Sequence, residues 1–382
     1  MARSRKTHPS KMPRGGKFLV KHFVLSFFIF FVSAIFPAGK GRTDRAVTLS
    51  RVIRVSVLLG LVLFLVSLIS MLVGPSHIGT ASLLKIFFPG LFGSEIVLPD
   101  MEKTILFSIR LPRIVFAGLV GAALAAAGVV FQGLLRNPLA DPYILGISGG
   151  SAVGAIIAII TGVSALPFGT PGLSFLGALA TIILVYGIAR SNRELQSNTL
   201  LLAGVIVNAF FSAVIMFLVS VSSNTNLHSI MFWLMGDLSL VVGEDIPAIA
   251  LFMAVGFSVI YLYARHLNLI VMSEETAMQL GVDVEKTKKI LFLTASLITA
   301  AAVSVSGIIG FVGLIIPHIM RMLLGSDHRM LLPASLLFGA SFLIAADTVA
   351  RTAMAPAELP VGVITALCGA PYFIYLLRRR GV

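Results

Sequence analysis

Cysteine, acidic residues and enzyme signatures are scarce or missing in this chain of 382 residues. The single cysteine, Cys368, excludes an intrachain disulfide, and without a CxxC partner or a histidine neighbour it indicates no metal site. The sequence has no phosphate-binding loop of the form GxxxxGKS or GxxxxGKT, no HExxH and no GxSxG. We therefore expect no catalytic residue, no metal and no cofactor bound by this chain, which is not an enzyme by itself.

Charged residues are also few, at 12%, whereas hydrophobic residues make up 57% and the mean hydropathy is +1.00. A water-soluble core cannot absorb that much apolar surface. Apolar runs of about 20 residues match the roughly 30 Å thickness of the hydrocarbon layer. We predict an all-α integral membrane protein with about ten transmembrane helices, at residues 52–73, 114–134, 144–162, 173–189, 200–221, 246–264, 290–306, 308–324, 331–350 and 360–377.

The net charge of +13 indicates topology rather than nucleic-acid binding, because the basic residues fall in the N-terminal stretch and in short breaks between apolar runs. If the first span leaves the cytoplasm, the cytoplasmic breaks hold most of these cations: Arg136, Arg190, Arg193, Arg265, Lys286, Lys288, Lys289, Arg321, Arg329 and residues 378–380. Both termini of this multi-pass cell-membrane protein are therefore predicted to be cytoplasmic.

The first fifty residues fit this pattern poorly. Residues 23–36 form an apolar stretch that is too short for a span, with lysine or arginine on both sides and no A-x-A-like cleavage site after it. We predict that residues 1–50 are a basic extension, cytoplasmic or interfacial, and that residues 51–382 are the transmembrane domain. An eleventh helix in the extension is the alternative.

Several motifs recur at fixed offsets. Gly128, Pro138 and Leu145-Gly146 recur 179 positions later as Gly307, Pro317 and Leu324-Gly325, and Gly204-Val-Ile recurs 158 positions later as Gly362-Val-Ile. The offset of 179 positions moves the second predicted helix onto the seventh, a shift of five helices. Because five is odd, the two copies would cross the membrane in opposite directions. An inverted repeat, which is a transporter architecture, is thus predicted. The alternative is that glycine simply recurs at helix packing faces.

A tight turn is predicted after the second span. Small residues from Gly121 to Gly128 favour close helix packing, and the two prolines of residues 138–142 end the helix. Asn137 and Asp141 can satisfy the backbone groups that are freed there.

Two further polar segments stand out. Residues 273–282 predict a short amphipathic cytoplasmic helix that ends at Gly281, which is either a handle for a soluble partner or a solvated connector. His318 follows Pro317 in an apolar run, and His328 lies ten residues on with no third ligand in reach. Structural roles are favoured over metal binding for both histidines.

These motifs support a family resemblance. In order along the chain they read Arg110-Leu-Pro-Arg113, Arg136-Asn-Pro-Leu-Ala-Asp-Pro142, Gly310-Phe-Val-Gly-Leu-Ile-Ile-Pro-His318, Asp327-His-Arg329, Ala346-Asp-Thr-Val-Ala-Arg351 and Glu358-Leu-Pro-Val-Gly362. From about residue 52 onward the chain resembles the FecCD-like permease family, the membrane subunits of iron-siderophore, haem and cobalamin ABC importers. The resemblance implies a type II ABC importer permease.

The resemblance also implies the partners of this chain. They are a second copy of itself, with the path for a metal chelate at the dimer interface, two ABC ATPase subunits that use ATP and Mg²⁺, and a periplasmic or lipid-anchored substrate-binding protein. Membrane lipid surrounds the assembly, and no nucleic acid is expected.

Three groups of residues take roles from the resemblance. The resemblance implies that the binding protein docks on Arg110, Arg113 and Arg351. The alternative is that these side chains extend to the lipid headgroups. The ATPase coupling helix comprises Glu274, Glu275, Thr276, Ala277, Gln279, Leu280, Gly281 and Val282. The cytoplasmic gate and pore comprise Asn137, Leu139, Asn198, Thr199, Gly204 and Asn208.

An ion-coupled secondary transporter is the alternative function. It predicts several intramembrane acids, whereas Asp347 is the one clear case and lies near the outer end of its span. The sequence leaves open which chelate is carried, siderophore-bound iron, haem or cobalamin, and whether the partner copy is identical or a paralogue.

Overall fold

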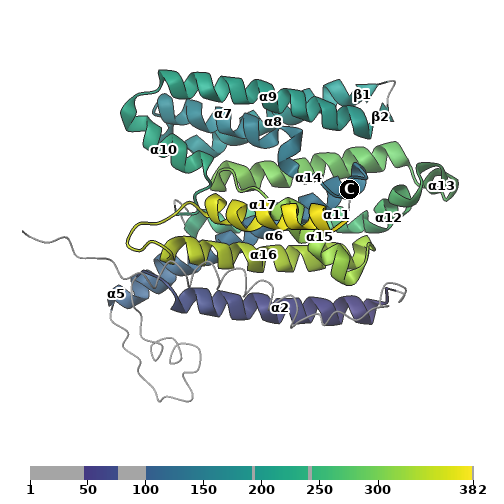
Figure 1. Ribbon diagram of the computed structural model, residues 1–382, viewed down its shortest axis with the longest axis horizontal. Helices are drawn as coiled ribbons and strands as arrows, with labels where there is room; N and C mark the ends of the chain where they lie inside the picture. The colour runs from purple at the N-terminus through teal and green to yellow at the C-terminus, as the bar shows by residue number, and fades with distance from the viewer. Residues whose placement is uncertain (1–46, 76–99, 192–193, 240–242, 381–382) are drawn as a thin grey trace, which may run out of the picture. The chain divides into compact units, whose positions relative to one another are not determined.

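The computed structural model describes residues 47–75, 100–191, 194–239 and 243–380, within one compact unit of the chain, Arg45–Val382 (Figure 1). The predicted extension of residues 1–50 lies almost wholly outside the described residues. Helices dominate the described part, and a two-stranded hairpin, β1 (Arg190–Ser191) with β2 (Glu194–Leu195), connects two of them.

Among the residues that the structure describes, six helices are long and apolar enough to cross a membrane. They are α2 (Leu49–Leu72), the continuous helix Asp100–Leu134, α8 (Gly169–Ala189), α9 (Ser197–Val221), α14 (Val284–Ser306) and α16 (His328–Thr352). The pair α11 (Ile246–Leu262) and α12 (Ala264–Met272), bent by 49°, is long and apolar enough only when the two helices are taken together. Three shorter apolar helices are α7 (Ile147–Ile160), α15 (Val312–Leu324) and α17 (Val361–Arg380). Each of these ten segments overlaps one of the ten predicted ranges.

The predicted start of the second span was wrong. Helix α5 (Asp100–Lys103), the π-helical segment η1 (Thr104–Arg110) and α6 (Leu111–Leu134) form one helix that begins 14 residues before residue 114. Within η1 the hydrogen bonds run five residues back, as from Leu111 N to Leu106 O. Pro112, which has no N–H to donate, is thereby accommodated at the start of α6 without a break.

Three other boundaries differ from the prediction. Helix α15 begins only at Val312, because Gly307 and Phe311 take positive φ angles of 69° and 70° and keep residues 307–311 out of a helix. The short helix α10 (Asn224–Leu234) and the helix α12 were not predicted. The polar starts of α14 and α16 extend those helices beyond their apolar runs.

Helix α6 lies at the centre of the bundle and packs against α14, α15 and α16 (Figure 1). Small residues make this possible: a Cβ on Gly128 would overlap the carbonyl oxygen of Gly313 in α15, and a Cβ on Gly121 would overlap that of Gly339 in α16. The predicted close packing of α6 is therefore confirmed. Helix α2 packs on α16, whereas α9 packs on α7 and α8.

The order of the helices agrees with two inverted halves of five spans each. Helices α2, α6 and α9 run opposite to α11, α14 and α17, their counterparts five spans later (Figure 1). Gly204 of α9 packs against the backbone of Ile144, just before α7, and Gly362 of α17 packs against that of Ile308, before α15. The shared Gly-Val-Ile motif thus makes equivalent contacts in both halves. Gly128 and Gly307 differ, since the first is helical and the second has φ 69°.

Candidate docking, gate and coupling sites

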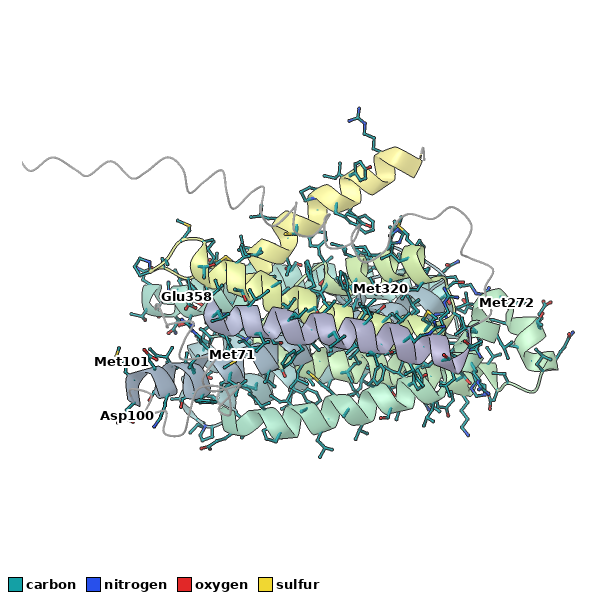
Figure 2. The ribbon with its side chains drawn as sticks, turned by 90° about the horizontal axis from the view of Figure 1, so that it is seen from below. Met71, Asp100, Met101, Met272, Met320 and Glu358 are labelled. Carbon is teal, nitrogen blue, oxygen red and sulfur yellow. The ribbon has the colours of Figure 1, made fainter. Side chains whose placement is uncertain are left out.

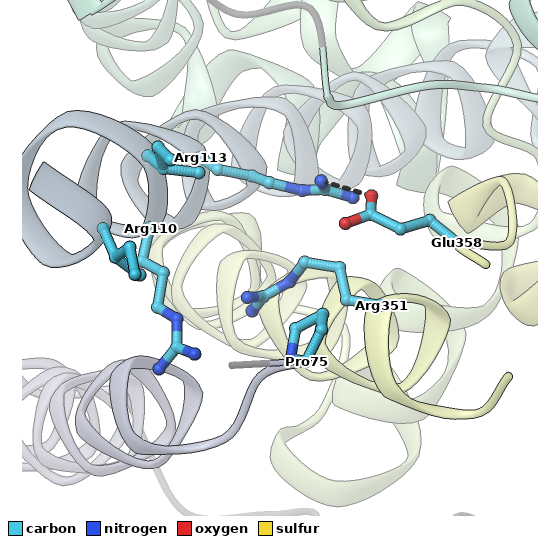
Figure 3. A pocket seen from close by; sticks show the side chains of 7 residues that line it. Pro75, Arg110, Arg113, Arg351 and Glu358 are labelled. Carbon is cyan, nitrogen blue, oxygen red and sulfur yellow. Dashed lines mark hydrogen bonds and ion pairs between the residues drawn. The ribbon is translucent and has the colours of Figure 1, made fainter. Parts of the chain in front are cut away.

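A charged cluster lies at the end of the bundle where α6 begins and α16 ends (Figures 2 and 3). Asp347 of α16, 1% exposed, lies between two guanidinium groups. Arg113 donates to it from Nη2 at 2.9 Å and from Nε at 3.0 Å, and Arg351 donates from Nε at 2.9 Å. A buried carboxylate with two cationic donors is satisfied electrostatically.

The same cluster reaches the surface through Glu358. Its carboxylate, on a side chain that is 38% exposed, accepts a hydrogen bond from Arg113 Nη1 at 2.7 Å. Arg110 instead turns toward α2, where its Nη1 donates to the carbonyl oxygen of Met71 at 2.6 Å. Arg351 also donates to Ser70 Oγ at 2.9 Å, so α2 and α16 are joined here by polar contacts.

The three predicted docking arginines therefore lie together around a cavity of about 150 Å³ that Ile105, Ile109 and Glu358 also line (Figure 3). Each arginine is held inside the chain, and Arg110 and Arg351 are only 3% exposed. Sequence reasoning missed the pairing with Asp347 and Glu358, although both acids stand in the motifs quoted above. Three arginines against two carboxylates leave the cluster cationic.

The turn after α6 lies at the opposite end of that helix and is closed by its own polar side chains. Asn137 Oδ1 accepts a hydrogen bond from Leu139 N at 2.9 Å, and Asp141 Oδ1 accepts one from Tyr143 N at 2.9 Å, which caps η2 (Pro142–Leu145). The predicted roles of Asn137 and Asp141 in the turn are confirmed. Burial raises the pKa of Asp141 to about 6, and the hydrogen bond from Tyr143 N opposes this shift.

The predicted gate residues come from this turn and from the first turn of α9. Ser197, the first residue of α9, donates a hydrogen bond to Leu134 O at 2.9 Å, which places Asn198 and Thr199 beside the end of α6. Leu139 is 40% exposed. The structure thus brings four of the six predicted gate and pore residues into one region.

Gly204 and Asn208 lie further along α9 on its inward face. A Cβ on Gly204 would lie 2.6 Å from Ile144 O, and Asn208 Oδ1 lies 3.0 Å from the Cβ position of Gly149 in α7. Both positions therefore pack on η2 and α7 within the subunit. The outward face of α9 carries exposed apolar side chains: Leu202, Val205, Ile206, Phe210, Met216, Phe217 and Val221.

The predicted cytoplasmic helix exists as α13 (Glu274–Gln279), at the end of the bundle opposite α5 (Figure 1). Ser273 Oγ accepts from Thr276 N at 3.2 Å and caps its start, and Gly281 ends it with φ 83°. Ala277 and Val282 point inward and form an apolar cluster with Ile270, Leu269 and Val284.

The outer surface of α13 is free for contact with another molecule. Leu280 is 63% exposed and Met278 is 56% exposed, although both are apolar. Glu275, Thr276 and Gln279 are exposed beside them. Two exposed apolar side chains beside polar ones are characteristic of a partner contact.

The two histidines His318 and His328 have structural partners. His318 is 3% exposed and its ring lies 6.3 Å from that of Phe373. His328 Nδ1 lies 2.6 Å from Asn268 Oδ1, and Asn268 Nδ2 donates to Asp327 at 2.9 Å. Burial raises the pKa of Asp327, but the hydrogen bonds from Arg329 and Asn268 outweigh it and lower the pKa to about 2. In the described part of the chain, no group of three or more His, Cys, Asp or Glu side chains could hold a metal ion.

A model of the FecCD transport family matches residues 61–379. The chain belongs to the FecCD transport family. This match covers all ten helical segments except the start of α2 and the last residue of α17.

Proteins similar to this FecCD-family chain are named as permeases of transport systems. It is 50% identical to the cobalamin import system permease protein BtuC of Halobacterium salinarum, over 74% of this chain and 76% of that protein. It is 40% identical to the hemin transport system permease protein HmuU of Yersinia pestis, over 74% of this chain and 85% of that protein.

A solved structure of a metal-chelate type ABC transporter in an inward-facing conformation matches with a TM-score of 0.73 and 35% identity, over 85% of this chain and 99% of that chain. PsaBC of Streptococcus pneumoniae, at 20% identity and a TM-score of 0.51, shares the fold. The FecCD-family chain is thus a multi-pass ABC importer permease, with a charged cluster at one end and both α13 and the turn of residues 136–141 at the other.

Proposed function

We propose that this permease carries a metal chelate, siderophore-bound iron, haem or cobalamin, into the cytoplasm as part of a binding-protein-dependent ABC importer. The observation that carries the proposal is 50% identity to a cobalamin import permease within a family match over residues 61–379. The relative named for hemin supports the wider class of bulky chelates.

The assembly contains two copies of this chain, two ATPase subunits and one binding protein. The exposed apolar face of α9 supports a second copy, and Met278 and Leu280 on α13 support an ATPase below it. ATP and Mg²⁺ are used by the ATPase, and this chain binds no cofactor of its own. Residues 1–50 are a cytoplasmic or interfacial extension, and both termini are cytoplasmic in a cell inner or cytoplasmic membrane.

Docking of the binding protein takes place at the cluster of Arg110, Arg113 and Arg351. Its excess of one positive charge and its cavity favour a partner with carboxylates. Because Glu358 is the most exposed member of the ion pairs, an incoming carboxylate competes with it for Arg113.

An ion-driven transporter is less well supported. The buried carboxylates among the described residues are Asp141 and Asp347. Asp347 accepts hydrogen bonds from two guanidinium groups, which makes it part of an ion-pair network between helices rather than of a proton path. Asp141 caps η2 rather than lining a path.

Uptake by the reconstituted complex tests the proposal. Proteoliposomes would hold this chain with its ATPase, and labelled cyanocobalamin, haem and a ferric siderophore would be offered with the binding protein outside. Uptake of one chelate is expected only when ATP and Mg²⁺ are present on the ATPase side. Uptake on a proton or sodium gradient without ATP would refute the proposal.

A further inference from the structure

We propose that Glu274 is a positioning residue that ties α13 to the gate turn of residues 136–141, so that movement of α13 displaces the gate. This inference rests on the proposed function, because it assumes that an ATPase moves α13. It assigns a mechanical role to an ion-pair network that joins three separate parts of the chain.

The two carboxylate oxygens of Glu274 are shared between two cations. Oε1 lies 3.4 Å from Arg136 Nη2, and Oε2 lies 2.6 Å from Lys288 Nζ. Lys288 belongs to α14 and its side chain is only 6% exposed, although it lies at the polar start of that helix. A second carboxylate near Lys288, that of Glu285, lies further away, with its Oε1 3.6 Å from Lys288 Nζ. A half-buried carboxylate between two cations is more strongly held than an exposed surface pair.

Arg136 connects this network to the gate. It is the second residue after α6, and its guanidinium also donates to Ile270 O of α12 at 2.7 Å. Asn137 follows it directly, and Leu139 lies two residues further on. A displacement of the Arg136 side chain therefore acts on the backbone that carries the predicted gate residues Asn137 and Leu139.

The backbone at Arg136 is an independent indication that its side chain is needed. Its φ angle is 46°, in the left-handed region where glycine is the favoured residue after a helix. The turn is closed there by hydrogen bonds from Arg136 N to Gly133 O and from Asn137 N to Gln132 O, both 3.2 Å. Glycine would make these backbone bonds with less strain, but it could not reach Glu274 or Ile270.

The body of α13 is anchored elsewhere. Its main packing partners are α12 and α14, through the apolar cluster around Ala277. That cluster fixes α13 as a folded unit and leaves Met278 and Leu280 outward for the ATPase. Removal of the charge on Glu274 should therefore leave the partner contact in place and loosen its connection to the turn.

The test compares two glutamates near Lys288 in the reconstituted complex. Glu274→Gln removes the charge between Arg136 and Lys288, whereas the matched control Glu285→Gln removes the more distant carboxylate, 3.6 Å from Lys288 Nζ, and leaves the pair of Glu274 with Arg136 intact. Chelate uptake and ATP hydrolysis are measured in the same proteoliposomes. We expect Glu274→Gln to co-purify with its ATPase and to transport at least about 5-fold less chelate per ATP than the wild type, with the ratio for Glu285→Gln close to that of the wild type. Equal ratios for the two variants would overturn the inference.

A double-variant comparison separates coupling from stability. Arg136→Gln alone should lower transport per ATP as Glu274→Gln does, and the double variant should be no worse than either single one. Effects that multiply would show that the two residues act independently and would overturn the inference. So would loss of ATPase co-purification in Glu274→Gln, which would place the residue in partner attachment. Absence of ATP-driven uptake by the wild-type complex would instead refute the proposed function itself.

Discussion

Asp347→Asn is the most informative single substitution at the end of the bundle where α6 begins and α16 ends. The carboxylate is 1% exposed and receives hydrogen bonds from both Arg113 and Arg351. Asparagine is similar in size and can still accept a hydrogen bond, but it carries no charge. Two guanidinium groups with little access to water would then face each other without their shared anion.

The expected cost follows from what each arginine retains. Removing one partner of a buried ion pair typically costs about 3–5 kcal/mol, because the remaining charge stays desolvated. Arg113 retains Glu358 at 2.7 Å and Arg351 retains Ser70 at 2.9 Å, so a loss of about 3 kcal/mol, at the lower end, is expected. Glu358→Gln removes a more exposed pair and should cost about 1 kcal/mol or less.

Unfolding of the purified permease in detergent measures this difference. The single tryptophan, Trp233, is 7% exposed and its fluorescence reports loss of the fold. Both variants would be titrated with denaturant beside the wild type. Asp347→Asn should unfold at clearly lower denaturant concentration, and Glu358→Gln should nearly match the wild type. If the two variants shift equally, or if Asp347→Asn is as stable as the wild type, burial of the carboxylate does not govern its contribution.

Three further outcomes are expected. Gly128→Ala should destabilise the protein by about 1–3 kcal/mol because its Cβ would overlap the Gly313 carbonyl, whereas Gly187→Ala, with open space around its Cβ, should be neutral or slightly stabilising in the same denaturant titration. Burial raises the pKa of Asp141 from its ordinary value of 3.8 to about 6, so the folded state binds this proton more tightly than the unfolded state. The resulting stabilisation is complete below pH 3.8 and is lost as the pH rises through about 6. Asp141→Asn should therefore be more stable than the wild type by up to about 3 kcal/mol at pH 7.5 and equally stable near pH 4. A difference between the two unfolding curves that is the same at both pH values would contradict this. Leu280→Asp, on the exposed surface of α13, should abolish co-purification of the ATPase while leaving the unfolding curve of the isolated permease unchanged.

The sequence located the ten apolar segments because hydropathy is a property of consecutive residues. It failed where a helix continues beyond its apolar run, as in residues 100–113 and the polar start of α14. Once a helix has formed, backbone hydrogen bonding carries it into the polar region beyond the hydrocarbon layer. The short helix α10 was missed for a related reason, since its polar first turn gives no membrane signal.

The functional positions were only partly predictable. The motifs identified the three predicted docking arginines and the short helix α13, and the structure places them at opposite ends of the bundle. Their partners were not predicted: Arg113 pairs with Asp347, 234 positions away in the sequence. Glu274 likewise reaches back to Arg136 across six intervening helices and the hairpin.

The sequence by itself determined that the chain crosses a membrane many times, that its segments are helical and that its motifs belong to one transport family. These properties follow from local composition, because lipid accepts only apolar segments whose backbone groups are satisfied within the helix. Only the tertiary structure decided which charges neutralise each other, that Gly204 and Asn208 face the inside of the subunit, and how α13 is attached to the gate turn. Such contacts depend on distances of a few ångströms between remote residues, which helix packing sets and linear spacing does not.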